Sequence, residues 1–158
     1  MKADTVIRPL SIPEWYRIAS EGGAPPVRIR LRGSSMFPLI RGGRDYVTVV
    51  PPGGKFVPGE IVLLADPERK RYVMHRVWEV RDGRVLTWGD NCPGPDGWVP
   101  LSSVWGKAAL IERGSRQIRP DPEKGMRWAA FWHRAGKVYR LLRRCGAVIL
   151  RLIRNTKA

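Results

Sequence analysis

The sequence predicts a mainly β protein that carries a basic amphipathic helix near its C-terminal end. Seventeen glycines and fourteen prolines divide the 158 residues into short segments joined by turns, which argues against a helical bundle. Between residues 27 and 119 the segments are rich in β-branched residues and partly alternate in polarity, as half-buried strands do. In residues 123–155 apolar residues instead recur every three or four positions, which is typical of one helix face. We therefore expect a compact core of coiled antiparallel sheets followed by a helix.

The N-terminal extension, residues 1–26, contains one short predicted helix, Ile12 to Ser20. Pro13 stands in its first turn, where a missing N–H costs no hydrogen bond. From Val27 to Arg32 apolar and basic residues alternate, which predicts the first strand. The chain must then turn within residues 33–38, where glycine, two serines and proline occur close together.

Six further strands are expected where apolar or β-branched runs lie between turn residues. They cover residues 46–50, 60–65, 71–81, 84–88, 98–99 and 104–112. The strongest local signal is Asp82-Gly83, because Asp-Gly between two such runs is typical of a tight β-hairpin turn. The prolines at 120 and 122 then end the β domain.

The last part of the chain holds most of the excess positive charge. The formal net charge is +15, and residues 123–158 contain ten Lys and Arg residues but a single acid. The predicted helix has an aromatic-bearing apolar face opposite a basic one, a pattern that favours peripheral contact with an anionic membrane. Docking on its own domain or on a partner protein is the alternative. Nucleic acid is not the expected partner, because only the basic charge, and no reading motif, points to it.

Compartment is predicted from what the sequence lacks. Cys92 and Cys145 are too few for a disulfide framework. Residues 1–24 carry charges throughout and have no apolar run long enough for a secretory signal. No stretch reaches the roughly 18 apolar residues that a membrane-spanning helix needs. We therefore expect a cytoplasmic protein that reaches the membrane face through its C-terminal helix.

Three short segments carry residues suited to nucleophilic catalysis. Ser35 follows the first predicted strand, His75 lies inside a later one, and Asp90 and Asp96 lie in the loop after the hairpin. A serine hydroxyl attacks well only when a base takes its proton, and imidazole suits that role near neutral pH. A carboxylate can hold the imidazole in the required tautomer. Since the chain has only two histidines, His75 is the candidate base.

These motifs resemble the signal-peptidase family of serine peptidases. Ser-Met-Phe-Pro at 35–38, His-Arg-Val at 75–77, and Gly-Asp-Asn at 89–91 with an aspartate at 96 occur in the family's order and at compatible spacing. They are most similar to the archaeal and endoplasmic-reticulum branch, which uses Ser-His-Asp where bacterial signal peptidases use Ser-Lys. The resemblance covers about residues 29–112 and implies a coiled antiparallel β peptidase core.

The resemblance also implies an activity: a serine endopeptidase that cleaves leader or signal segments by acyl transfer. Ser35 matches the nucleophile, His75 the general base and Asp96 the third triad member, while Asp90 matches a supporting acid and is the alternative triad acid. The implied substrate is an extended peptide or preprotein with small residues before the scissile bond, and no cofactor or metal is needed. Two features depart from the family. Gly33 stands where most members have a serine that donates to the oxyanion, and the family's N-terminal membrane helix is missing.

Other interpretations of the same residues stay open. Ser35 could cap a turn, His75 could be a half-buried strand residue, and both aspartates could serve the Gly/Pro-rich loop. Cys92 lies between the two aspartates, but nothing else indicates a thiol nucleophile. His75, Asp90 and Cys92 are too few ligands, without the paired spacing of a metal site.

Two alternatives concern the protein as a whole. One is a catalytically silent scaffold of the signal-peptidase type. The other is a regulator similar to the self-cleaving repressors, which share the Gly-x-Ser-Met form but have lysine where His75 stands. Such a regulator needs a helix-turn-helix domain, and the 26 residues before the first predicted strand are too few for one.

Overall fold

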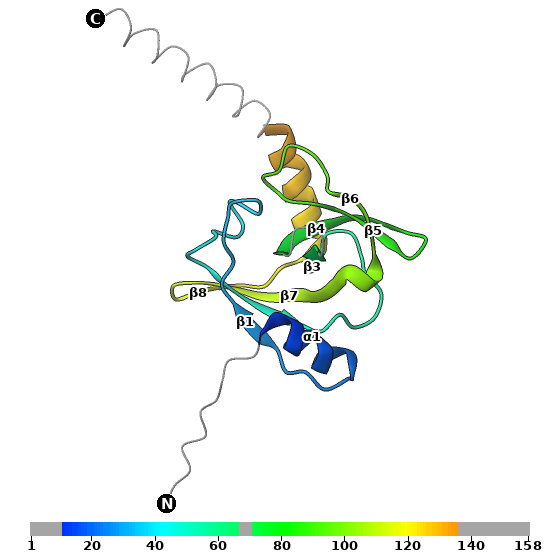
Figure 1. Ribbon diagram of the computed structural model, residues 1–158. Helices are drawn as coiled ribbons and strands as arrows, with labels where there is room; N and C mark the ends of the chain where they lie inside the picture. The colour runs from blue at the N-terminus through cyan, green and yellow to red at the C-terminus, as the bar shows by residue number, and fades with distance from the viewer. Residues whose placement is uncertain (1–10, 67–70, 136–158) are drawn as a thin grey trace, which may run out of the picture.

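The computed structural model describes residues 11–66 and 71–135, which form an eight-stranded antiparallel sheet with a helix near each end (Figure 1). This confirms the mainly β class. In chain order the elements are α1 (Ile12–Ser20), β1 (Val27–Ile29), β2 (Tyr46–Val50), β3 (Ile61–Asp66), β4 (Arg71–Arg81), β5 (Arg84–Trp88), β6 (Gly97–Pro100), the 3₁₀ turn η1 (Leu101–Ser103), β7 (Val104–Arg113) and β8 (Arg116–Ile118). A further helix covers residues 122–135.

The strands follow the order β1-β2-β7-β3-β4-β5-β6 across the sheet, and β8 also pairs with β7. Two long strands change neighbours along their length. β7 pairs with β3 through residues 104–107 and with β8 through residues 111–113. β4 pairs with β3 through residues 71–76 and with β5 through residues 76–81. Each half of β4 therefore lies in a different part of the sheet.

Strand β3 lies at the centre of the core because both of its faces are buried. Ile61 and Leu63 belong to one apolar cluster, and Val62 and Leu64 belong to a second one. This follows from the alternation of side chains along a strand, and it explains the unbroken apolar run in the sequence. Helix α1 closes the first cluster with Trp15, which is 2% exposed and donates from its indole N–H to the carbonyl of Pro25 at 2.7 Å.

Most predicted elements are confirmed within one or two residues. α1 and the β4–β5 hairpin have the predicted bounds, and Asp82 and Gly83 both have positive φ, as this hairpin turn requires. The first strand is shorter than predicted and ends at Ile29 instead of Arg32. The carbonyl of Leu31 accepts a hydrogen bond from the N–H of Gly43, so the chain leaves the ladder there. The sequence pattern does not predict β8, which has only three residues.

The helix of residues 122–135, orange in Figure 1, packs against its own domain. Its inner face is buried at Ala129 and His133, which are 0% and 5% exposed, and the His133 ring centroid lies 3.9 Å from that of Trp88 on β5. Gly125 lies so close to Arg76 of β4 that an added Cβ would be 2.4 Å from Nη1. Residues 122–135 therefore dock on their own domain, which is one of the alternatives that the sequence leaves open.

The remainder of the predicted helix, residues 136–155, lies outside the described residues. Most of its basic residues are there, so contact with a membrane stays a prediction. Among the described residues, no helix combines the length and the hydrophobicity that crossing a bilayer requires.

Candidate active site

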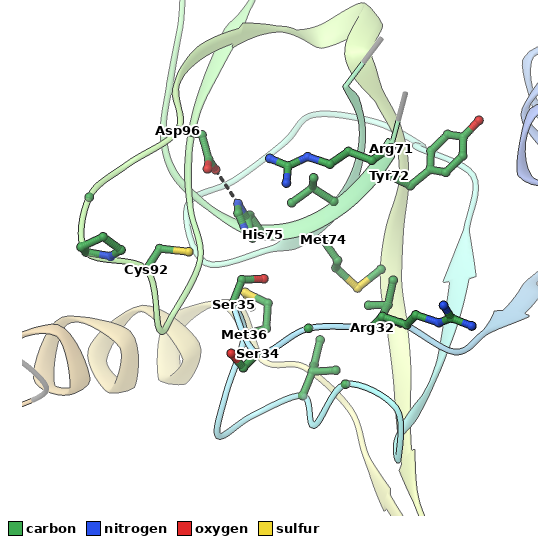
Figure 2. Close-up of a pocket in the computed structure, with 17 residues that line it drawn as sticks. Arg32, Ser34, Ser35, Met36, Arg71, Tyr72, Met74, His75, Cys92 and Asp96 are labelled. Carbon is green, nitrogen blue, oxygen red and sulfur yellow. Dashed lines mark hydrogen bonds and ion pairs between the residues drawn. The ribbon is translucent and has the colours of Figure 1, made fainter. Parts of the chain in front are cut away.

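His75 and Asp96 form the centre of the candidate site. Nδ1 of His75, on β4, lies 2.5 Å from Oδ2 of Asp96, which directly precedes β6 (Figure 2). Thr87 of β5 holds the acid in place, because its hydroxyl donates to the same Oδ2 at 2.9 Å and its carbonyl accepts from the N–H of Asp96 at 2.8 Å. A carboxylate can only accept, so Nδ1 carries the ring proton, and the lone pair of the neutral ring is on Nε2.

The surroundings of His75 favour its charged form. Its side chain is only 6% exposed, whereas that of Asp96 is 31% exposed. Burial lowers the pKa of His75, but the hydrogen bond with Asp96 and the adjacent Cys92 thiol raise it, and the net pKa is about 9 instead of 6.5. The site therefore stabilises an imidazolium, which is the state that a general base reaches after accepting a proton.

The second ring nitrogen, Nε2, is buried and makes no hydrogen bond to any part of the chain that the structure describes. Gly89 lies beside it. A Cβ added to Gly89 would be 2.8 Å from Nε2 of His75, 2.7 Å from Sγ of Cys92 and 2.8 Å from the carbonyl oxygen of Ser35. Three chain segments thus meet around one point, and a glycine at position 89 leaves room for them.

Ser35 lies in the turn between β1 and β2, below the His75 ring in Figure 2. The next residue, Met36, anchors this turn: it is 4% exposed and belongs to the core, and its sulfur accepts from the N–H of Asp90 at 3.5 Å. Asn91 makes two further links. Its N–H donates to the carbonyl of Ser35 at 2.7 Å, and its side-chain amide donates to the carbonyl of Ser34 at 3.1 Å. The serine turn is therefore held against the loop that carries both aspartates.

Gly33, two residues before Ser35, has a backbone conformation that disfavours side chains. Its φ is +88°, in the left-handed region. Gly42 packs closely against it, since a Cβ on Gly42 would lie 1.9 Å from the carbonyl oxygen of Gly33. A serine at position 33 would therefore strain the backbone.

A groove of about 530 Å³ runs past these residues. Residues 31–36 and 71–75 line it, together with Ile40, Gly42, residues 92–94 and Asp96. Along the groove, residues 71–75 of β4 pair with β3, whereas pairing with β5 begins at Arg76. Within the described parts of the chain, this half of β4 therefore has a strand partner on one side only. Its other edge offers backbone donors and acceptors to an extended peptide.

Asp90 binds Arg76 and not His75. Its two carboxylate oxygens accept from Nε and Nη2 of Arg76 at 2.9 and 2.7 Å, and both side chains are 1% exposed. Nη1 of Arg76 also donates to the carbonyl of Gly59 at 2.8 Å. His75 and Arg76 are consecutive on β4, so their side chains point to opposite faces. Of the two acids that the sequence leaves open, Asp96 is the one paired with His75.

Cys92 is a free, half-buried cysteine whose thiol lies on the His75 side of the loop (Figure 2). Its N–H donates to the carbonyl of Gly89 at 2.9 Å, and its own carbonyl accepts from the indole N–H of Trp88 at 3.1 Å. The Trp88 ring in turn packs at a tilt against the ring of His133. The helix of residues 122–135 therefore supports the loop that carries Cys92.

Sequence reasoning gives no role to Thr87, Arg76 or Asn91, although all three build the site. Arg76 and Asn91 lie inside the motifs His-Arg-Val and Gly-Asp-Asn, so the motifs themselves carry a signal for them. The sequence carries no such signal for Thr87, because threonine is a common residue in β-strands.

Comparison with known proteins adds nothing to this geometry: no protein-family model matches the chain, and no curated protein matches it. Within residues 11–66 and 71–135, no group of three or more His, Cys, Asp and Glu side chains is arranged so that it could hold a metal ion.

Proposed function

We propose that the protein is a serine endopeptidase similar to signal peptidases, which cleaves leader or signal segments by acyl transfer. One observation carries this proposal. Asp96 engages Nδ1 of His75, while Nε2 has no hydrogen-bond partner in residues 11–66 and 71–135 and lies beside a groove that Ser35 also lines. A carboxylate, an imidazole and a hydroxyl in one groove are the groups that this reaction needs.

In the proposed reaction, Ser35 Oγ attacks the scissile carbonyl while Nε2 of His75 takes its proton. Asp96 keeps Nδ1 protonated and stabilises the imidazolium. The imidazolium then gives its proton to the leaving amine, and water hydrolyses the acyl-enzyme by the same route in reverse. The backbone N–H of Ser35 is the family's oxyanion donor that this chain retains.

The substrate that fits this site is an extended peptide segment. We place it along residues 71–75, whose open edge can pair with a peptide backbone as β-augmentation does. This pairing would hold the scissile bond beside the Ser35 turn without help from a cofactor. Small residues before the scissile bond are the preference implied by the resemblance to signal peptidases.

The main rival is a catalytically silent scaffold, and Gly33 is the observation that favours it. A missing oxyanion donor costs a serine hydrolase about 3–4 kcal/mol of transition-state stabilisation. At 25 °C that is a loss of about 10²–10³-fold in rate, which slows a peptidase but leaves measurable hydrolysis. A slow peptidase would still hydrolyse peptides. A scaffold would show no turnover and no activated serine, so the two can be told apart by experiment.

The test is covalent labelling of the full chain with a fluorophosphonate probe, followed by peptide mass spectrometry. We expect the probe on Ser35, and we expect Ser35→Ala and His75→Ala to abolish labelling. Ser34→Ala is the matched control, because it removes the neighbouring hydroxyl and should leave labelling intact. Cleavage of a panel of leader-type peptides with small residues at the cut site provides the second readout.

Two results would overturn the proposal. One is a wild-type chain that neither labels nor cleaves any peptide although it is folded, which is the behaviour of a scaffold. The other is labelling or cleavage that persists in Ser35→Ala, since the nucleophile would then lie elsewhere.

A further inference from the structure

The Cys92 thiol occupies a position that the proposed hydrolysis does not use. Cys92 lines the same groove as Ser35, His75 and Asp96, and the residue is half-buried. A single point next to Gly89 lies 2.7 Å from Sγ of Cys92 and 2.8 Å from Nε2 of His75. The thiol and Nε2 of the imidazole therefore border the same small space.

The state of His75 makes this neighbourhood chemically active. Nε2 is buried without a hydrogen-bond partner among the described residues, and the residue is 5% exposed. An imidazole in this position can accept a thiol proton and then stabilise the thiolate by its charge, as in cysteine–histidine pairs. The raised pKa of His75 agrees with such a pairing, since Cys92 is one of its causes after burial and Asp96.

We propose that Cys92 is a modification site, at which hydrogen peroxide oxidises a thiolate formed with the help of His75. Where His75 is neutral, the Cys92 thiol gives its proton to Nε2; where His75 is already protonated, the thiol proton goes to solvent and the imidazolium stabilises the thiolate by its charge. The thiolate sulfur then attacks one oxygen of the peroxide, so an S–O bond forms and the O–O bond breaks. The departing hydroxide takes the proton from the imidazolium and leaves as water. Sulfur is oxidised by two electrons to a sulfenic acid, and peroxide is reduced.

The modification has a consequence for the site. A sulfenic oxygen on Cys92 would lie next to Nε2 of His75 and could hydrogen-bond to it, in the place where the base must meet the Ser35 hydroxyl. Oxidation would thus stop hydrolysis, and reduction by a thiol would restore it. This consequence rests on the proposed peptidase function, whereas the reactivity of Cys92 does not.

The first experiment measures reactivity alone. The full chain carrying Cys145→Ser, in which Cys92 is the only cysteine, is treated with hydrogen peroxide, trapped with dimedone and analysed by peptide mass spectrometry. We expect Cys92 to oxidise about tenfold faster than glutathione at pH 7. His75→Ala should reduce the rate to that of glutathione. Asp96→Asn should also slow it, and provides the test if His75→Ala does not fold. A rate no faster than that of glutathione, or one that neither substitution changes, would overturn the proposal.

The second experiment measures the consequence through fluorophosphonate labelling of Ser35. Peroxide should abolish labelling of the Cys145→Ser chain, and dithiothreitol should restore it. The chain that also carries Cys92→Ser should label equally with and without peroxide. If Cys92 reacts rapidly but Ser35 never labels, the peptidase proposal fails and the reactive thiol stands. If Ser35 labels and peroxide has no effect on it, the proposed control by Cys92 is overturned.

Discussion

Asp96 and Asp90 lie six residues apart in one loop, yet their carboxylates serve opposite faces of β4. Asp96 accepts from His75 at 2.5 Å in the groove, whereas Asp90 binds Arg76 at 2.7 and 2.9 Å in the interior. The two strand residues are consecutive, so the alternation of β4 assigns one acid to each face. Substitution of either acid should therefore produce a different kind of defect.

Asp96→Asn should disable catalysis while leaving the fold intact. An asparagine amide can donate to Nδ1 of His75, which places the ring proton on Nε2 and removes the base. We expect kcat to fall by about 10³–10⁴-fold. Unfolding free energy should change little at pH 10, where the stabilisation from protonated His75 is already lost and where the 31% exposed side chain of Asp96 contributes little else. Steady-state kinetics and urea unfolding measure the two quantities. A variant that loses its fold instead of its activity would contradict this role for Asp96.

Asp90→Asn should instead lower the stability of the fold. Arg76 is 1% exposed and would keep its charge without a carboxylate partner, a loss that typically costs about 3–5 kcal/mol of unfolding free energy. The control is Asp82→Asn, since Asp82 is 89% exposed in the hairpin turn and asparagine tolerates its positive φ. The control should change stability by less than about 0.5 kcal/mol. Equal stability of the two variants in urea would exclude the structural role of Asp90.

The dependence of activity on pH should be shifted to alkaline values. The base must be neutral, and the pKa of His75 is raised to about 9, so kcat/KM should rise from pH 7 and reach half its maximum near 9. A half-maximum near 6.5, the ordinary value for histidine, would contradict a raised pKa of His75 in the folded chain. Asp96 and Cys92 face the ring, and Arg71 lines the same groove. Because Cys92 is one cause of the increase, Cys92→Ser should lower the midpoint.

The same shift has a consequence for stability. The pKa of His75 is higher in the folded chain than in the unfolded one, so protonation favours the folded state. Its contribution is fully present below about pH 6.5 and is lost as pH rises through about 9. Unfolding free energies at pH 6 and pH 10 for wild type and His75→Gln should show this difference, and NMR titration of the histidine ring protons gives the pKa directly. A pH-independent difference between the two chains would show that the pKa is not raised.

Gly89→Ala tests the convergence of three segments at one point. An added Cβ would lie within 2.8 Å of His75, Cys92 and Ser35, so at least one of them must move. A displacement of this kind near reacting groups can cost on the order of 10²-fold in kcat/KM. Gly94→Ala is the matched control, since Gly94 also lines the groove and a Cβ there meets nothing within 4 Å. Similar activities for the two variants would show that the loop adapts easily.

Local signals in the sequence predict much of the fold. They fail where the bounds of an element depend on contacts between residues far apart in the sequence. The hairpin turn at residues 82–83 is specified by its own two residues, so its strands have the predicted bounds. The end of β1 instead depends on a hydrogen bond between Leu31 and Gly43, which no local pattern encodes. Strand β8 exists only because β7 offers it an edge.

The candidate site shows the same division. Motif order predicts that Ser35, His75 and Asp96 act together; the three residues line one groove, and their catalytic roles stay a prediction. Motif order does not choose between Asp90 and Asp96, because both aspartates lie in a loop where turn chemistry alone would explain them. The choice depends on Arg76, whose burial is a tertiary property: an arginine in a strand is normally expected at the surface.

The docked helix of residues 122–135 should be required for the loop that carries Cys92 and Asp96 to keep its shape. Ala129 is fully buried in this contact, while Phe131, two residues later on the same helix, is 63% exposed. Ala129→Arg should displace the helix and lower the unfolding free energy by at least about 2 kcal/mol. It should also reduce kcat/KM, because His133 would leave Trp88, whose indole N–H holds the carbonyl of Cys92. Phe131→Arg adds the same charge on the outer face and should leave both quantities near wild type. If the two variants behaved alike, the helix would have no part in supporting the loop that carries Asp96.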